Sequence, residues 1–280
     1  MQKYLLCLLI NCIASVALNA QSGTNQGGEP VHKEYLQTLF QVSPRVDVVL
    51  NKNNANFYLE GLINTNGVYA SIIEQTRWNI KPGIDIGLTD KWYVGASERI
   101  NMNSAGVYNY TTQFYIQHRG ELLGLNLLKE FAYEQFNFVD GTLNSTTVNG
   151  TSSTRRPAIG RFGIGLGLGK YVQVKENHVA VFLSYRPYIQ FDYVQDGIAY
   201  FKNRFIDYTN LRMDVGYLVN KTYYIGLYAS RDTNYTYVPS SDPYNSNSIT
   251  PIFGIACNIL FYAGRDQEKS LSSFRYFYTK

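Results

Sequence analysis

Apolar and polar residues alternate along most of the chain from about residue 75 onward. Between Arg77 and Leu88, Trp78, Ile80, Ile84, Ile86 and Leu88 share one face, and the opposite face is polar or glycine. A period of two is typical of a β-strand whose two faces meet different surroundings. Because the same alternation recurs in segment after segment, the sequence predicts an all-β protein.

The alternating segments number ten. We expect strands at 43–50, 75–88, 92–102, 107–117, 121–138, 157–172, 178–194, 205–218, 222–232 and 251–262. Long connections alternate with short ones such as 89–91 and 219–221. An antiparallel up-and-down transmembrane β-barrel has this arrangement, with an even strand count and both termini at the rim of the short turns. The segment 51–74 is partly apolar, and a hairpin inside it would raise the count to twelve.

Composition agrees with a membrane barrel better than with a soluble domain. Aromatic residues make up 15% of the chain and charged residues 16%, below the roughly 25% charged residues of soluble domains. Mean hydropathy is nevertheless −0.21, and no run of about 18 apolar residues follows residue 20. A barrel wall exposes only every second residue to lipid, which reconciles these values. The net charge of +4 is too small to indicate nucleic-acid binding.

The first 20 residues resemble a secretory signal. Lys3 precedes an apolar stretch from Tyr4 to Leu18, and cleavage is expected after Ala20. A lipid anchor at Cys12 is the alternative. We therefore expect a signal peptide at 1–20, a periplasmic N-terminal extension at 21–42, the barrel at 43–262 and a periplasmic C-terminal tail at 263–280. Cys257 is then the only mature cysteine, so no internal disulfide is expected.

The chain resembles the small outer-membrane β-barrel proteins of Bacteroidota-type bacteria. The resemblance rests on the signal ending in Ala20 and Gln21, the aromatic alternating strands, and the turns LTDKW (88–92) and VNKTYY (219–224). It covers roughly residues 43–262 and contains no motif specific to one family. It implies a place in the outer membrane and assigns no catalytic residue.

No motif for catalysis, a metal or a cofactor is present. The glycines at 163–169 with Lys170 suggest a phosphate loop, but Leu168 replaces the third glycine of a nucleotide fingerprint and Tyr171 replaces the Ser or Thr of a P-loop. A nearly bare inward strand face, which leaves room for long side chains from other strands, is the structural explanation. The three histidines, His32, His118 and His178, fall in no metal spacing or nucleophile elbow. We expect no enzyme, no metal and no cofactor.

Charged residues gather on the face predicted to line the lumen. The lumen candidates are Arg77, Lys81, Asp85, Arg99, Arg161, Arg186, Asp192, Arg212 and Asp214. Glu130 and Glu134 would also face the lumen if the alternation in the strand 121–138 is unbroken. Lys129 raises this question because it falls on the apolar face of that strand, where a bulge would shift the alternation. The set predicts either a constriction with a mild preference for anions or, as the favoured interpretation, a lumen filled by paired side chains.

The sequence therefore predicts a non-enzymatic protein of the bacterial outer membrane, whose partner is membrane lipid and not nucleic acid. Its role would be that of a narrow pore, or a structural or loop-mediated binding role. The alternatives are an outer-membrane enzyme that modifies lipids, and a soluble periplasmic β protein that binds a hydrophobic ligand.

Overall fold

The computed structural model is built of strands. It describes residues 32–50, 55–67, 69–70, 75–104, 106–138, 146–148, 151–153, 158–174, 177–193, 206, 208–219, 222–237 and 245–263. The strands are β1 (His32–Tyr35), β2 (Leu39–Leu50), β3 (Ala55–Asn64), β4 (Tyr69–Ala70), β5 (Gln75–Thr76), β6 (Trp78–Gly87), β7 (Trp92–Asn103), β8 (Gly106–Leu122), β9 (Leu125–Phe138), β10 (Thr146–Val148), β11 (Thr151–Ser153), β12 (Ala158–Val174), β13 (Asn177–Tyr193), β14 (Tyr208–Val219), β15 (Tyr223–Tyr237) and β16 (Asn245–Ala263).

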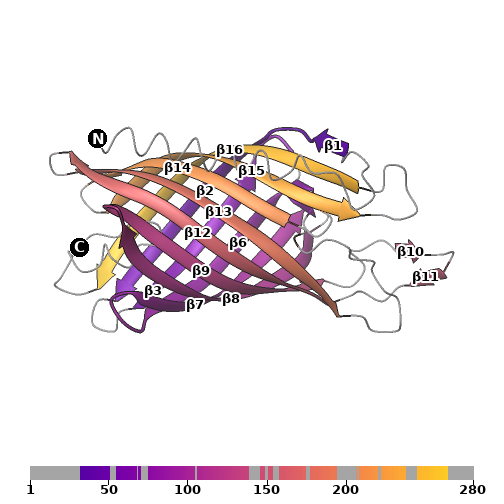
Figure 1. The fold of residues 1–280 in the computed structure, drawn as a ribbon, viewed down its shortest axis with the longest axis horizontal. Helices are drawn as coiled ribbons and strands as arrows, with labels where there is room; N and C mark the ends of the chain where they lie inside the picture. Colours follow the sequence, from indigo (N-terminus) through magenta and orange to yellow (C-terminus); the bar gives the residue numbers. More distant parts are fainter. Residues whose placement is uncertain are drawn as a thin grey trace.

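Eleven of these strands close into one barrel. Each of β2, β3, β6, β7, β8, β9, β12, β13, β14 and β15 pairs antiparallel with the next, and β16 closes the ring by pairing with β2. The closing pair is parallel, from Leu39 beside Ile252 to Leu50 beside Ala263. β1 continues this seam by pairing with residues 246–249 of β16. The predicted all-β barrel is confirmed (Figure 1).

The odd number of strands places the two described ends of the chain at opposite rims. We call the rim that carries connections 51–54, 88–91, 123–124, 175–176 and 220–222 the turn rim, and the other the loop rim. β2 begins at the loop rim, at the end of the barrel where β1 and the β10–β11 hairpin also lie (Figure 1), whereas β16 ends at the turn rim. The expectation that the chain enters and leaves the barrel at one rim was therefore wrong, because one further strand changes the parity.

The further strand is β3, in the segment that the alternation had left as a connection. Its outward side chains Phe57, Leu59 and Ile63 are exposed, but Tyr58 and Leu62 are also large and lie on the inward face. Apolar residues on both faces hide a period of two, so the segment reads as an irregular apolar stretch. β2 likewise begins at Leu39 instead of residue 43, inside the expected N-terminal extension.

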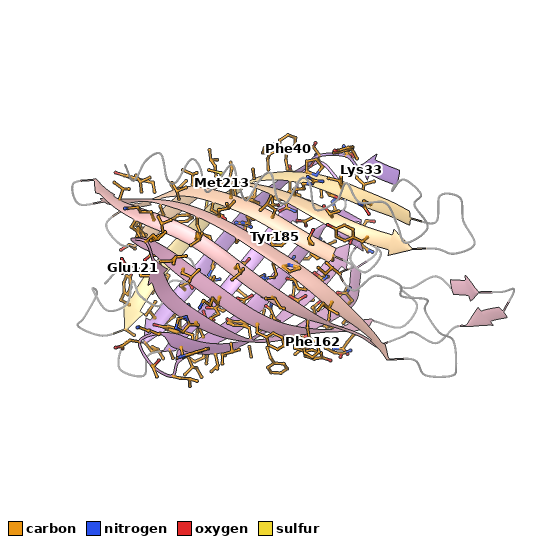
Figure 2. The ribbon with its side chains drawn as sticks, in the orientation of Figure 1. Lys33, Phe40, Glu121, Phe162, Tyr185 and Met213 are labelled. Carbon is orange, nitrogen blue, oxygen red and sulfur yellow. The ribbon has the colours of Figure 1, made fainter. Side chains whose placement is uncertain are left out.

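The two faces of the wall have opposite polarity. In β2 the exposed positions include Phe40, Val46 and Val48, while Gln41, Ser43, Arg45 and Asp47 are buried inside. The same reversal runs through β6 and β8. Figure 2 shows Phe40 and Phe162 directed away from the barrel axis. The wall therefore presents an apolar surface outward and a mainly polar surface to the lumen.

Aromatic rings inside the barrel lie over glycines of neighbouring strands. The directly paired residues are Tyr58 with Gly83, Tyr115 with Gly95, Tyr188 with Gly163, Phe182 with Gly169, and Tyr228 with Gly254. In each pair, ring atoms take the space that a Cβ on the glycine would need. The glycine run of β12 thus makes room for Phe182, Arg186 and Tyr188 of the adjacent β13, which supports the structural explanation of that run.

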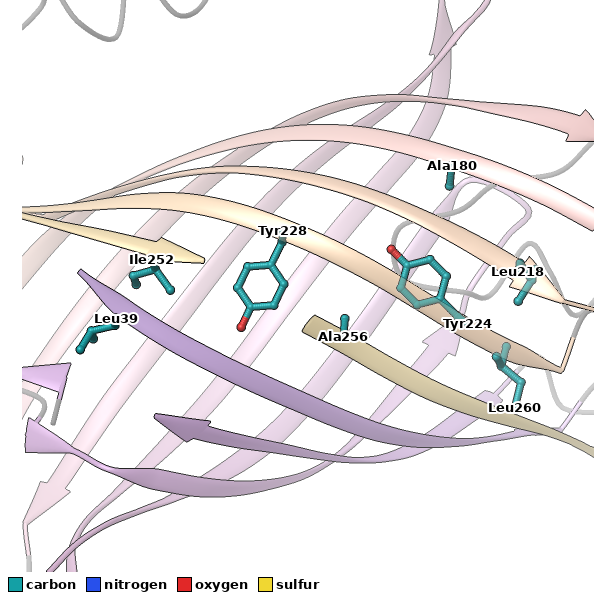
Figure 3. Close-up of a cluster of buried hydrophobic side chains, with 8 residues drawn as sticks. All are labelled: Leu39, Ala180, Leu218, Tyr224, Tyr228, Ile252, Ala256 and Leu260. Carbon is teal, nitrogen blue, oxygen red and sulfur yellow. The ribbon is translucent and has the colours of Figure 1, made fainter. Parts of the chain in front are cut away.

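One sector of the lumen is apolar instead of polar. Leu39, Ala180, Leu218, Tyr224, Tyr228, Ile252, Ala256 and Leu260 pack together inside β13 to β16 and the start of β2 (Figure 3). Tyr171 and Tyr262 pack against them. Because this cluster includes Leu39 and Ile252 on the two sides of the parallel seam, it packs behind the closure of the barrel.

We expect Gly95→Val to destabilise the barrel by about 1–3 kcal/mol, the usual cost of overpacking. The added side chain would displace the Tyr115 ring and break the hydrogen bond from its hydroxyl to Asp85. The control is Ala96→Val, one residue along on the outward face, which should change stability little. Urea unfolding in detergent micelles, followed by tryptophan fluorescence, measures both. Equal midpoints for Gly95→Val and the wild type would contradict the packing described.

Candidate functional site in the barrel lumen

The lumen contains a cavity lined by side chains from strands all around the barrel. About 210 Å³ of it is accessible to the centre of a water molecule. Five cationic side chains line it, namely Lys81, Arg99, Arg161, Arg186 and Arg212. The lining also includes the carboxylates of Glu60 and Asp232 and the aromatic residues Phe182, Tyr188 and Tyr208.

Glu134 on β9 is the centre of a polar network that joins several strands. Its side chain is 1% exposed, and Arg161 Nε donates to its Oε2 at 2.6 Å. Gln113 Nε2 donates to Oε1 at 2.9 Å, and an Arg99 nitrogen lies 3.8 Å away. Lys81 reaches the same network because its Nζ donates to Gln113 Oε1 at 3.0 Å. A carboxylate this deeply buried needs such partners to stay ionised.

Aromatic rings surround the Arg161 guanidinium. It lies 4.7 Å from the ring centroid of Phe136, 4.2 Å from that of Tyr188 and 5.1 Å from that of Tyr208. Each distance lies within cation–π range, and the effect is larger at desolvated sites. Arg161 is therefore held by one carboxylate and three rings, as part of the packing of the wall.

A second network lies nearer the turn rim. Arg186 forms an ion pair with Glu130 at 2.5 Å, and Gln117 Nε2 donates to the other oxygen of Glu130 at 2.6 Å. Arg119 donates to Gln117 at 3.0 Å and stacks over the Tyr93 ring at 3.6 Å. The network therefore links four strands, β7, β8, β9 and β13, through side chains alone.

Two further ion pairs join residues two positions apart on the same strand. Arg45 binds Asp47 at 2.7 Å and Glu60 at 3.2 Å, and its guanidinium lies 4.0 Å from the centroid of the Tyr58 ring. Arg212 binds Asp214 at 2.6 Å. Residues i and i+2 of a strand share a face, which brings each of these pairs together inside the barrel.

The predicted lumen residues fall into three groups. Lys81, Asp85, Arg99, Arg161, Arg186, Arg212 and Asp214 face inward and take part in the contacts described above. Arg77 is exposed at the loop rim and does not line the cavity, because it lies in the bend between β5 and β6. Asp192 lies in β13, opposite Ile159 of β12, but its side chain is outside the described part.

Glu130 and Glu134 both face inward, and β9 keeps a single phase. Leu127, Lys129, Phe131 and Tyr133 stay together on the outward face, so Lys129 points outward without a bulge. The alternation in this strand is therefore unbroken, as the inward placement of the two glutamates required.

Sequence reasoning missed five inward charges, namely Arg45, Asp47, Glu60, Arg119 and Asp232. Glu60 lies on the strand that was not predicted, Arg119 was assigned to a turn, and Asp232 lies where β15 was expected to end. Extending the period of two through these segments would have found them. With them, the described inward charges are seven cations, Arg45, Lys81, Arg99, Arg119, Arg161, Arg186 and Arg212, and seven carboxylates, Asp47, Glu60, Asp85, Glu130, Glu134, Asp214 and Asp232. This balance favours a lumen filled by paired side chains over a constriction that prefers anions.

The turn-rim side of the cavity is filled. Eleven inward side chains there are almost fully buried: Asp47, Val49, Asn56, Tyr93, Gln117, Arg119, Ala180, Phe182, Leu218, Tyr224 and Leu260. By contrast, the Arg99, Arg186 and Arg212 side chains in the cavity are 19–25% exposed. The cavity is therefore a pocket on the loop side of a packed floor.

Within the described residues, no helix is long and apolar enough to cross a membrane, and no three of the His, Cys, Asp and Glu side chains gather as a metal site would require. His118 lies on the outward face beside Trp92, whereas little is described of His32 and His178 beyond their strands. Comparison with protein-family models and with curated proteins found no match to this chain.

We expect Glu134→Gln to destabilise the barrel by about 3–5 kcal/mol, because breaking a buried ion pair leaves Arg161 uncompensated. Glu34→Gln makes the same change at an exposed position of β1 and should alter stability by less than about 0.5 kcal/mol. Adding Arg161→Met to Glu134→Gln should restore part of the loss. Urea unfolding midpoints of the four proteins in one detergent test this, and equal losses at positions 34 and 134 would argue against the network.

Proposed function

We propose that this protein spans the bacterial outer membrane as a closed β-barrel that anchors its loops at the cell surface, and that it does not form an open pore. The observation that carries the proposal is the reversed polarity of the wall. A soluble barrel keeps its apolar residues inside, whereas here Leu227, Ile225 and Leu166 are more than half exposed and Glu134, Asp47 and Gln117 are buried. Such a wall needs an apolar surrounding.

The outward aromatic residues support the same placement. Trp78, Tyr110 and Phe253 are exposed toward the loop rim, and Trp92, Tyr217, Tyr223 and Phe261 toward the turn rim. Aliphatic residues such as Val215, Leu227 and Ile255 lie between them. Aromatic side chains prefer the two interfaces of a bilayer, so two girdles around an aliphatic belt match one membrane thickness.

Connection lengths set the orientation. Outer-membrane barrels keep short turns on the periplasmic side and longer connections outside. The turn rim then faces the periplasm, and the connections 139–157 and 194–207 belong to the cell surface. In this orientation, the pocket lies on the external side of the packed floor. The first described residue, His32, lies at the external rim.

The packed floor argues against diffusion through the lumen. A pore needs a continuous aqueous path. The almost fully buried side chains on the turn side, Asp47, Gln117 and Leu260 among them, oppose such a path. A soluble protein that holds a hydrophobic ligand is also disfavoured, because the cavity lining is rich in charge and the apolar surface lies outside. No described group of side chains favours a lipid-modifying enzyme.

We expect Leu227→Arg to destabilise the barrel in lipid by about 2–4 kcal/mol, the cost of a cation near the middle of a bilayer. Leu227 is 66% exposed in the aliphatic belt, whereas Leu88, 60% exposed in the 88–91 turn, provides the control Leu88→Arg with a cost of about 0–1 kcal/mol. Urea unfolding in phosphatidylcholine vesicles measures both. A Leu227→Arg variant as stable as Leu88→Arg would mean that water, not lipid, surrounds the belt.

We also expect no steady conductance from the purified protein in planar bilayers. The full chain would be extracted from isolated outer membranes in mild detergent, and insertion confirmed by flotation with vesicles. Its unboiled band in SDS gels should run faster than the boiled one if the barrel resists SDS. Regular single-channel steps from inserted protein would overturn the closed lumen, and recovery in the soluble fraction without detergent would overturn the membrane placement.

A further inference from the structure

Three hydrogen-bond donors form a row across the outward face near the turn rim. Trp92 begins β7 and pairs with His118 of β8, which in turn pairs with Lys129 of β9. The Trp92 and His118 rings meet edge to face, with centroids 4.8 Å apart. Side chains directly opposite on adjacent strands have Cβ atoms about 4.5–5.5 Å apart, so all three donors belong to one patch. We call these three residues the donor row.

The donor row has no acceptor among the described residues. Lys129 is exposed and makes no hydrogen bond or ion pair with them, and the same is true of the Trp92 indole N–H. His118 Nδ1 is buried without a partner, so a proton placed on it would lack an acceptor. The proton is then favoured on Nε2.

The apolar surroundings of the donor row make the absence of an acceptor energetically unfavourable. Lys129 pairs on its other side with Leu166, and Phe131 and Ile116 lie nearby on the same face, all of them exposed and apolar. A cation among apolar side chains that face lipid is unfavourable unless its head reaches water or a counter-charge. The patch thus combines a lysine side chain with the N–H donors of two aromatic rings at the edge of an apolar wall.

We propose that the donor row binds the phosphodiester group of a glycerophospholipid in the periplasmic leaflet. A phosphodiester carries one negative charge and several acceptor oxygens, and its acyl chains would lie along the apolar wall beside Leu166 and Phe131. The Trp92 ring lies where aromatic side chains meet headgroups. This inference rests on the proposed function, because it needs the turn rim to lie at a membrane interface.

The test is native mass spectrometry of the full chain in mild detergent, titrated with phosphatidylglycerol or with a diacylglycerol of the same acyl chains. The wild type should bind phosphatidylglycerol at least about tenfold more tightly than diacylglycerol, as expected for hydrogen bonds to a charged group. Lys129→Gln should lose most of that difference. Trp92→Phe keeps the ring and should weaken phosphatidylglycerol binding less. The control Lys33→Gln removes an exposed lysine at the loop rim and should bind like the wild type.

Equal binding of phosphatidylglycerol by Lys129→Gln and the wild type overturns the site while the membrane placement stands. Displacement of the lipid by millimolar inorganic phosphate would identify a free-phosphate site instead and also overturns it. A protein that stays soluble without detergent and floats with no vesicles overturns both this site and the proposed function.

Discussion

A charge inside so narrow a barrel has to find its counter-charge inside the barrel as well. Glu134, at 1% exposure, has no route to bulk water and is held by Arg161 at 2.6 Å, with Arg99 and Gln113 close by. The cost of removing an ion from water is several kcal/mol, which only good geometry and further hydrogen bonds offset. The even balance of described inward cations and carboxylates follows from this requirement.

The pairing does more than neutralise charge, because it connects strands that share no backbone hydrogen bonds. Glu134 on β9 reaches Arg99 on β7, and Glu130 on β9 reaches Arg186 on β13. Across the parallel seam, Tyr228 of β15 donates to Gln41 of β2 at 2.9 Å, spanning β16. A slip of one residue in any strand would turn its charges outward. The networks therefore fix the register, including that of the seam, whose parallel pairing is slightly weaker per residue than antiparallel pairing.

The sequence predicts this fold well where the two faces differ and poorly where they do not. In β6, apolar Trp78, Ile80 and Ile86 alternate with Asn79, Lys81 and Asp85, and both the strand and the faces were predicted. In β3 the inward Tyr58 and Leu62 are large and mainly apolar, as are their outward neighbours. The strand was therefore missed, and the predicted number of strands was even. The polar networks were only half predictable, because alternation places a charge on a face but cannot give its partner on a distant strand. The pairs of aromatic rings with glycines needed the register, which no local pattern supplies.

The position of Lys129 follows from the requirement inside the barrel. Glu130 and Glu134 must both face the lumen to meet Arg186 and Arg161, and the period of two then turns Lys129 outward. A shift of phase that hid Lys129 would instead place both glutamates on the apolar face and leave two arginines unpaired inside. One outward lysine near the rim is the smaller cost, since its flexible stem lets the ammonium reach a polar layer. Under the proposed membrane placement, a lipid phosphate at the donor row would offset that remaining cost, so the outward site is a consequence of how the interior charges are paired.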